Sequence, residues 1–303
     1  MILNNNKIIN EMNCNDKPVI KAYHGNNLVY WDCLTDVIVP DNEIWYYTAD
    51  EQVFELGRYS SYIEEEWGVK IVSNTYVRGL GRIVADSPIT VIPAWAFGRN
   101  DDTYHHHTQL TTVILPRTIR VIGNRAFCCN WGLTSLIMRE GITTIGFGAF
   151  EQCVALSFDS LPSTITSIGA GAFQHTKLNL STCVNVFPAS ITSIPKRAYF
   201  GCKVNKSLVL PPHITSIGEY AFAQIDGLQE LTIGCTEAIT MESYAFEYNR
   251  QLSKIIWETI NPNYNIQTTA FNSCPSNGIL DTDLSSIGRQ FLNTVNLSSW
   301  SIE

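Results

Sequence analysis

The chain has 303 residues, 45% of them hydrophobic and 16% charged, and 20 basic against 28 acidic side chains give it a net charge of −8. This composition excludes a wholly disordered chain. The acidic balance and the lack of a Lys/Arg cluster argue against nucleic acid and anionic membrane surfaces as partners. No apolar run approaches the roughly 18 residues of a transmembrane helix, so we expect no membrane insertion.

The N-terminal part of the chain predicts a tail and a small β domain. Residues 1–18 are rich in Asn and lack the apolar core of a signal peptide, and we expect a flexible tail there. In residues 19–86, apolar–polar alternation is interrupted by turn residues, which predicts an all-β segment of three hairpins. The hairpins are expected to turn at Gly25–Asn27, near Ala49–Asp50 and at Gly79–Gly81.

From residue 87 to about residue 280 the chain repeats itself, most often with a period of 23 residues. One phrase has the form I-T-x-I-G-x-x-A-F, and its copies begin at Ile89, Ile119, Ile142, Ile165, Ile191, Ile214, Ile239 and Ile266. A second phrase, L-x-x-L-x-L, lies between these copies. It begins at Leu110, Leu133, Leu228 and Leu252, with a looser copy from Ser207. A fixed period of this length is the signature of a solenoid.

Each repeat predicts one rung of a leucine-rich-repeat solenoid, an α/β-class superhelix rich in β structure with short helical turns. The L-x-x-L-x-L stretch is typical of a short strand, I-T-x-I of an extended return segment, and Ala-Phe of a single helical or 3₁₀ turn. One rung cannot bury its own apolar side chains, so about eight rungs must stack. The aromatic residues expected to stack in the core are Phe97, Phe127, Phe150, Phe173, Tyr199, Phe222, Phe246 and Phe271. The exposed ends need caps, which we expect from residues 19–86 and 281–303.

The nine cysteines include no C-x-x-C pair, which argues against a zinc knuckle. Three of them follow the repeat aromatic by three residues, in a position that Asn takes in other repeats. The residues in this position are Cys153, Cys202, Cys274, Asn100, Asn130 and Asn249. Small side chains at an inward turn fit there or cap backbone groups, so we interpret these thiols as structural. The sequence does not decide whether any thiols pair, because pairing depends on geometry.

The two phrases, recurring in phase, resemble the BspA-like leucine-rich-repeat family of bacterial proteins. The resemblance covers residues 89–280, and it weakens in the shortened copies that begin at Ile239 and Ile266. It implies a solenoid without enzymatic activity, commonly on a cell surface and used for adhesion or protein binding. The surface location rests on the resemblance alone, because no leader is visible in this chain.

The candidate binding site is a surface formed by the predicted strands, where positions between inward residues point outward. These positions are Thr112, Ile114, Ser135, Ile137, Val209, Glu230, Thr232, Lys254 and Ile256. Ile114, Ile137, Val209 and Ile256 would align as an apolar stripe, and an aligned row of exposed aliphatic side chains indicates a contact surface. The alternative is that these residues reflect β propensity alone, with no partner.

Other motifs give little support to catalysis or metal binding. His105–His107 lies with Asp101 and Asp102 in the long first repeat, and these side chain types bind transition metals. Adjacent histidines on a strand point to opposite faces, so a solvated loop is the favoured interpretation. Gly146–Gly148 and Gly169–Gly171 are in phase with the repeat and are interpreted as turn glycines, not as a dinucleotide fingerprint. No motif pairs a nucleophile with a base, so we expect no enzyme, no cofactor and no bound metal.

The sequence therefore predicts a non-catalytic binding or adhesion protein that presents its repeat surface to a protein or a glycan. The main alternative is a structural or assembly component, of a surface layer or a phage-like particle, that self-associates through the N-terminal β segment. That segment is rich in aromatic residues such as Trp31 and Trp45. A third hypothesis, a metal-dependent enzyme, rests on the His105–His107 loop alone.

Overall fold

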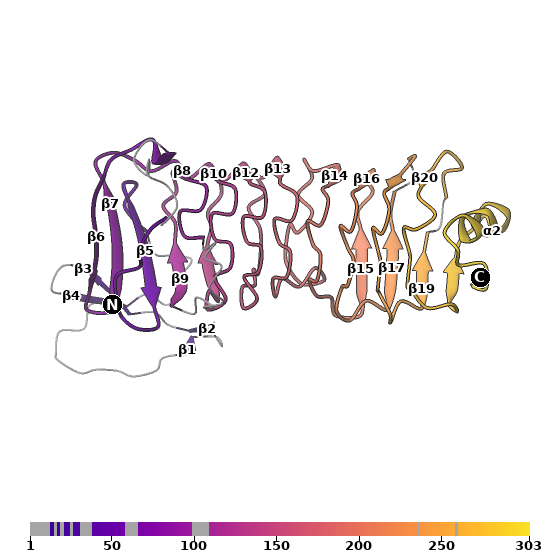
Figure 1. Ribbon diagram of the computed structural model, residues 1–303, viewed down its shortest axis with the longest axis horizontal. Coiled ribbons are helices and arrows are strands. Elements are labelled where there is room, and N and C mark those ends of the chain that lie inside the picture. Colours follow the sequence, from indigo (N-terminus) through magenta and orange to yellow (C-terminus); the bar gives the residue numbers. More distant parts are fainter. Residues whose placement is uncertain are drawn as a thin grey trace.

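The computed structural model describes residues 38–57, 66–98, 109–235, 237–257 and 260–303, and the backbone of four short strands between residues 13 and 30. Most of the predicted flexible tail, and the whole His105–His107 loop, lie outside the described residues. Rungs stack in one elongated row, with an antiparallel sheet at the N-terminal end and helix α2 (Ser285–Thr294) at the C-terminal end (Figure 1). The predicted leucine-rich-repeat solenoid is confirmed.

The I-T-x-I phrase forms a two-residue strand in every rung, and these strands stack in parallel into two sheets. The first sheet contains β8 (Val91–Ile92), β10 (Val121–Ile122), β12 (Thr144–Ile145) and β13 (Ser167–Ile168). The second contains β14 (Ser193–Ile194), β16 (Ser216–Ile217), β18 (Thr240–Met241) and β20 (Asn265–Ile266). Each strand buries its second residue and directs the first toward the surface, as the period of two requires.

Most strands on the other side of the solenoid come from the L-x-x-L-x-L phrase, and the last two strands lack it. The strands on this side are β9 (Leu110–Ile114), β11 (Ser135–Ile137), β15 (Ser207–Leu210), β17 (Glu230–Ile233), β19 (Lys254–Ile256), β21 (Ile279–Asp281) and the terminal β22 (Ser301–Ile302). They belong to two sheets, because residues 156–188 lack the phrase. The rungs between the sheets make single bridges, such as Ser160 with Val184. The outward surface is therefore divided into two parts.

An aromatic stack runs through the core. The predicted residues are all buried, and neighbouring rings lie nearly parallel with centroids 4.9 Å (Phe97 and Phe127) to 5.7 Å (Phe127 and Phe150) apart. Tyr199 takes one place in the stack and donates its hydroxyl hydrogen bond to Val186 O at 2.7 Å. Stacked rings gain energy beyond the burial of their area, so each aromatic ties its rung to both neighbours.

The Ala-Phe segment is a succession of tight turns, not a helix. Ala126 N–H donates to Gly123 O at 3.3 Å and Cys128 N–H to Arg125 O at 3.1 Å, which is the i to i−3 pattern of a 3₁₀ turn. Arg125 lies at a φ of 53°, in the left-handed region, and this interrupts a continuous helix. The prediction of a short turn is correct, and the left-handed residue is an addition from the structure.

The Asn/Cys position caps the stack. Cys153 Sγ donates to Phe127 O at 3.0 Å, and Cys202 Sγ donates to Phe173 O at 3.3 Å. Asn249 Nδ2 makes two such bonds, to Phe222 O at 2.9 Å and to Phe246 O at 2.7 Å. No disulfide joins the cysteines between Cys128 and Cys274. The interpretation of this position as a backbone cap is confirmed.

The N-terminal sheet continues the solenoid. β5 (Glu43–Thr48) pairs antiparallel with β9 on one side and with β7 (Leu80–Ala85) on the other, and β6 (Ile71–Val77) pairs with β7, giving the order β11-β9-β5-β7-β6. The hairpin predicted near Ala49–Asp50 is wrong, because residues 51–57 form no strand and β9 takes that place. The third hairpin is present, but it turns at Arg78–Gly79, where both φ angles are positive (54° and 80°), as a type I′ turn requires.

Four short strands precede this sheet along the chain. They are β1 (Asn13–Cys14), β2 (Lys17–Pro18), β3 (Lys21–His24) and β4 (Asn27–Tyr30). β3 pairs antiparallel with β4, which is the first predicted hairpin, and β1 pairs with β2 in the same sense. At the other end, α2 buries Phe291 and Leu292, and Phe291 packs edge-on against Phe271 of the last rung at 6.0 Å. Helix α2 thus covers the apolar end of the stack.

Candidate binding surface

The predicted surface residues near the N-terminal sheet lie on a closed face, defined here as the outward side of β5, β7, β9 and β11. Register places Trp45 of β5 opposite Ile114 of β9, and Ile137 beside Ile114 on β11. Trp45, Ile114 and Leu80 form a second apolar cluster outside the main core, and Ile114 has no exposed area. The prediction that Ile114 is exposed is wrong. Its apolar neighbours come from strands far from it in the sequence.

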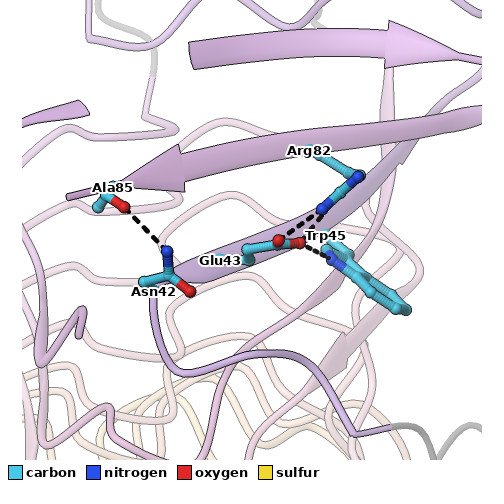
Figure 2. A network of polar contacts seen from close by, with 5 residues as sticks. All are labelled: Asn42, Glu43, Trp45, Arg82 and Ala85. Atoms are coloured by element: carbon cyan, nitrogen blue, oxygen red, sulfur yellow. Dashed lines mark hydrogen bonds and ion pairs between the residues drawn. The ribbon is translucent and has the colours of Figure 1, made fainter. Parts of the chain in front are cut away.

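A buried carboxylate fixes the closed face. Glu43 Oε2 accepts hydrogen bonds from Trp45 Nε1 at 2.7 Å and from Arg82 Nε at 3.0 Å, and Asn42 Nδ2 donates to Ala85 O at 2.9 Å (Figure 2). Glu43 and Trp45 are both buried. A buried charge is tolerated when it is paired and hydrogen-bonded, which is the case here. The network holds the Trp45 ring against the outward side of the sheet.

Other predicted residues on this part of the surface are also less accessible than expected. Thr112 is buried, and Ser135 and Ile137 are half-buried. Ile137 packs against the cluster that contains Ile114. The predicted stripe from Ile114 through Ile137 to Val209 is therefore not continuous.

The remaining predicted residues lie on an open face, defined as the outward side of β15, β17, β19 and β21. Parallel register aligns Val209, Thr232 and Ile256 in one row, and Glu230 and Lys254 in the next row. Val209 is 58% exposed, and the other four are half-buried. The structure thus brings these five predicted residues together on one sheet.

A trough of about 600 Å³ runs along the strand starts of the open face. Most of the residues that line it are polar, and they include both charges. The lining residues are Lys206, Gln229, Glu230, Ser253, Lys254, Asn277, Gly278, Ile279, Ser299 and Ser301. Volumes between about 300 and 1,000 Å³ are typical of sites for small ligands.

One ion pair joins neighbouring strands of the open face. Lys254 Nζ lies 2.8 Å from Asp281 Oδ2, and this hydrogen bond raises the pKa of the Lys254 ammonium above its ordinary value. Ser253 Oγ donates to Gln229 O at 3.3 Å, which leaves the hydroxyl oxygen as an acceptor toward the trough. The open face therefore offers a ligand both hydrogen-bond donors and acceptors, and both positive and negative charges.

The buried thiols of the Asn/Cys position are poor nucleophiles. Burial raises the pKa of the Cys202 and Cys274 thiols to about 12, so neither is a thiolate nucleophile at neutral pH. Across the described ranges, no group of three or more His, Cys, Asp or Glu side chains is placed to hold a metal ion. No helix in those ranges is long and apolar enough to cross a bilayer.

Of the ten residues that line the trough, sequence reasoning identified only Glu230 and Lys254. Lys206, Gln229 and Ser253 immediately precede the outward residues of their strands, and Asn277 lies in the turn before β21. A signal was present for Gln229 and Ser253, since each is the first variable residue of its L-x-x-L-x-L phrase. No sequence signal pointed to Asn277, because β21 lacks the phrase.

The comparison with known families agrees with this architecture. The family described as BspA type leucine rich repeat region matches residues 80–203 and 184–298 in six copies. The match covers most of the chain, and the protein belongs to this family. No curated protein matches the chain.

Solved structures of other bacterial repeat proteins are similar to the chain. A leucine-rich repeat protein from Bacteroides ovatus is 16% identical over 78% of this chain and 68% of that one, with a TM-score of 0.38. The pneumococcal vaccine antigen PcpA is 14% identical over 77% and 88%, with a TM-score of 0.28. A leucine rich cell surface protein from Faecalibacterium prausnitzii is 18% identical over 64% of each chain, with a TM-score of 0.33. These low values leave the family match as the basis of the assignment.

Proposed function

We propose that the protein is a non-catalytic binding protein whose open face takes a protein ligand at a cell surface. The observation that carries the proposal is the open face itself. It aligns Val209, Thr232 and Ile256 beside a polar trough, on a rigid sheet. Rigid, extended surfaces of this kind suit repeat proteins to binding, and leucine-rich-repeat families are in general protein-binding and non-enzymatic.

A glycan is the second candidate ligand. The trough presents amides, hydroxyls and a carboxylate together, from residues such as Gln229, Asn277, Ser301 and Glu230. These groups hydrogen-bond to the hydroxyls of a sugar. A protein ligand is preferred because the row that begins at Val209 adds an apolar contact next to the polar one, the combination found in protein interfaces.

The test uses an immobilised panel of extracellular-matrix proteins and a glycan array, probed with the purified full chain. For any ligand found, Val209→Asp and Ile256→Asp are expected to weaken binding at least tenfold, because each places a charge in the apolar row. Val184→Asp is the matched control, since Val184 is 60% exposed but lies outside both sheets of longer strands. Equal binding by all three variants would remove the open face as the binding site.

Location is tested separately. Protease shaving and fractionation of the native cells are expected to find the protein accessible from outside. Protein that is protected from protease and that co-purifies with particles would overturn the surface location and favour the assembly alternative.

A further inference from the structure

Strand β6 forms the outer edge of the N-terminal sheet. It is terminal in the order β11-β9-β5-β7-β6, and Figure 1 shows it at the end of the molecule opposite α2. No strand of the described chain pairs with its outer side. Every residue of Ile71–Val77 is half-buried or exposed. Among the described residues, β6 is therefore an unpaired strand edge at this end of the solenoid.

Backbone hydrogen bonds of β7 alternate between its two neighbours. Ala85 N–H donates to Asn42 O on the β5 side at 2.8 Å, whereas Asp86 N–H donates to Lys70 O on the β6 side at 3.0 Å. The alternation of an antiparallel ladder continues along β7, so its even-numbered residues face β6.

The same alternation decides which groups of β6 face outward. Ser73, Thr75 and Val77 lie opposite even-numbered residues of β7 and direct their backbone groups toward it. Asn74 and Tyr76 lie between them and direct N–H and C=O away from the sheet. These outward groups form a template for a further antiparallel strand.

The edge lacks most of the features that protect sheet edges from pairing. Natural edges carry Pro, charged side chains or bulges. Here Ile71–Val77 contains no Pro and no charged residue, and Val72 and Val77 are 61% and 62% exposed. A bulge occurs between Ile71 and Ser73, which leaves Ser73–Val77 as a regular edge.

The edge is complementary to itself. A two-fold axis through Thr75 places Asn74 opposite Tyr76 of a second copy, and Tyr76 opposite Asn74. Both pairs then use outward backbone groups, and each exchanges its N–H and C=O bonds. The same register sets Arg78 opposite Val72, so no like charges meet. A second copy of the chain therefore satisfies the edge in one defined register.

We propose that the protein self-associates through β6 of two copies, which pair antiparallel about Thr75 and join the two N-terminal sheets into one. The two solenoids extend away from this contact in opposite directions. The contact lies on the far end of the molecule from the open face and goes beyond ligand binding.

Covalent trapping tests the register. On the axis, the two copies of Thr75 form a non-hydrogen-bonded pair with Cα atoms about 4.5 Å apart, which lies within the Cα separations of about 4.4–6.8 Å that disulfides span. Thr75→Cys is expected to give a dimer on a non-reducing gel after mild oxidation with oxidised glutathione, reversed by dithiothreitol. Val77→Cys is the matched control, because Val77 faces Ser73 of the second copy, and it is expected to stay monomeric like the wild type. Absence of the Thr75→Cys dimer, or equal crosslinking by both variants, overturns the proposal.

Sedimentation velocity over a concentration series tests the association without a crosslink. The wild-type chain is expected to show a reversible dimer. Thr75→Lys places two cations opposite each other and is expected to raise the dissociation constant several-fold, with less effect at high salt. An equimolar mixture of Thr75→Lys and Thr75→Glu is expected to restore the dimer.

Two results overturn the proposal: a wild-type chain that is monomeric at every concentration, or a dimer that Thr75→Lys leaves unchanged. Val209→Asp separates this contact from ligand binding, since it is expected to dimerise like the wild type. Loss of ligand binding with intact dimerisation, or the reverse, assigns each failure to its own surface.

Discussion

The repeat strands of the two sheets of longer strands pair in parallel, but the outward side is covered in one sheet and exposed in the other. On the closed face, Ile114 is buried beside Trp45, a residue contributed by a strand outside the repeat. On the open face, Val209 is 58% exposed. The comparison shows that repeat position fixes which side chains point outward, whereas the elements packed at each end decide whether those side chains are available to a ligand.

The largest expected effect on stability comes from a charge placed in the apolar cluster of the closed face. Ile114→Asp introduces an unpaired charge into a buried cluster and is expected to lower the free energy of unfolding by at least about 4 kcal/mol. Ile256→Asp, the matched change on the open face, is expected to cost about 1 kcal/mol or less. Urea unfolding followed by circular dichroism measures both. Similar losses in the two variants would contradict the distinction between the faces.

A smaller effect is expected from the carboxylates. Glu43→Gln keeps the shape of the side chain but weakens its charge-assisted bonds to Arg82 and Trp45, which is expected to cost about 1–3 kcal/mol. Glu230→Gln on the open face is expected to change stability by no more than about 0.5 kcal/mol. If Glu43→Gln unfolds at the same urea concentration as the wild type, the network in Figure 2 does not stabilise the closed face.

The smallest effect on stability is expected from the two Asn caps, Asn130 under the closed face and Asn249 under the open face. Asn249 Oδ1 accepts from Ile225 N at 2.9 Å, whereas Asn130 Oδ1 is buried without a partner. Asn249→Cys loses that acceptor and is expected to cost about 1 kcal/mol more than Asn130→Cys. The difference is read from thermal unfolding of the two variants side by side, and an opposite order would exclude this explanation of the Asn/Cys choice.

Much of the fold was predictable because the same pattern of residues recurs in every repeat. The aromatic row from Phe97 to Phe271 and the cap position of Cys202 follow from a fixed spacing, so each copy confirms the others. Most copies have a left-handed residue before the Ala. Gly148 and Gly171 indicate it in two copies, but Arg125 and the other non-Gly residues in this position give no sign of a positive φ in the sequence.

The candidate site was predictable only in part. Alternation gave the outward direction of Val209 and Ile256. It gave the same direction to Ile114, but the burial of Ile114 depends on β5 pairing with β9, a contact between segments far apart in the chain. No local pattern encodes such pairing. The break between the two sheets could be predicted from residues 156–188, which lack the L-x-x-L-x-L phrase. Its effect on the predicted apolar stripe became clear only from the strand register in the structure.

The Asn and Cys caps also bear on how the chain length can change over generations. Each cap bonds to its own rung or to the rung before it, as Asn249 does with Phe246 and Phe222, and each ring stacks only on its two neighbours. A duplicated or deleted rung of one full period would therefore recreate every such contact at the join. The number of rungs can therefore change by mutation without disturbing the folding of the other rungs, while β5 and α2 continue to cap the two ends.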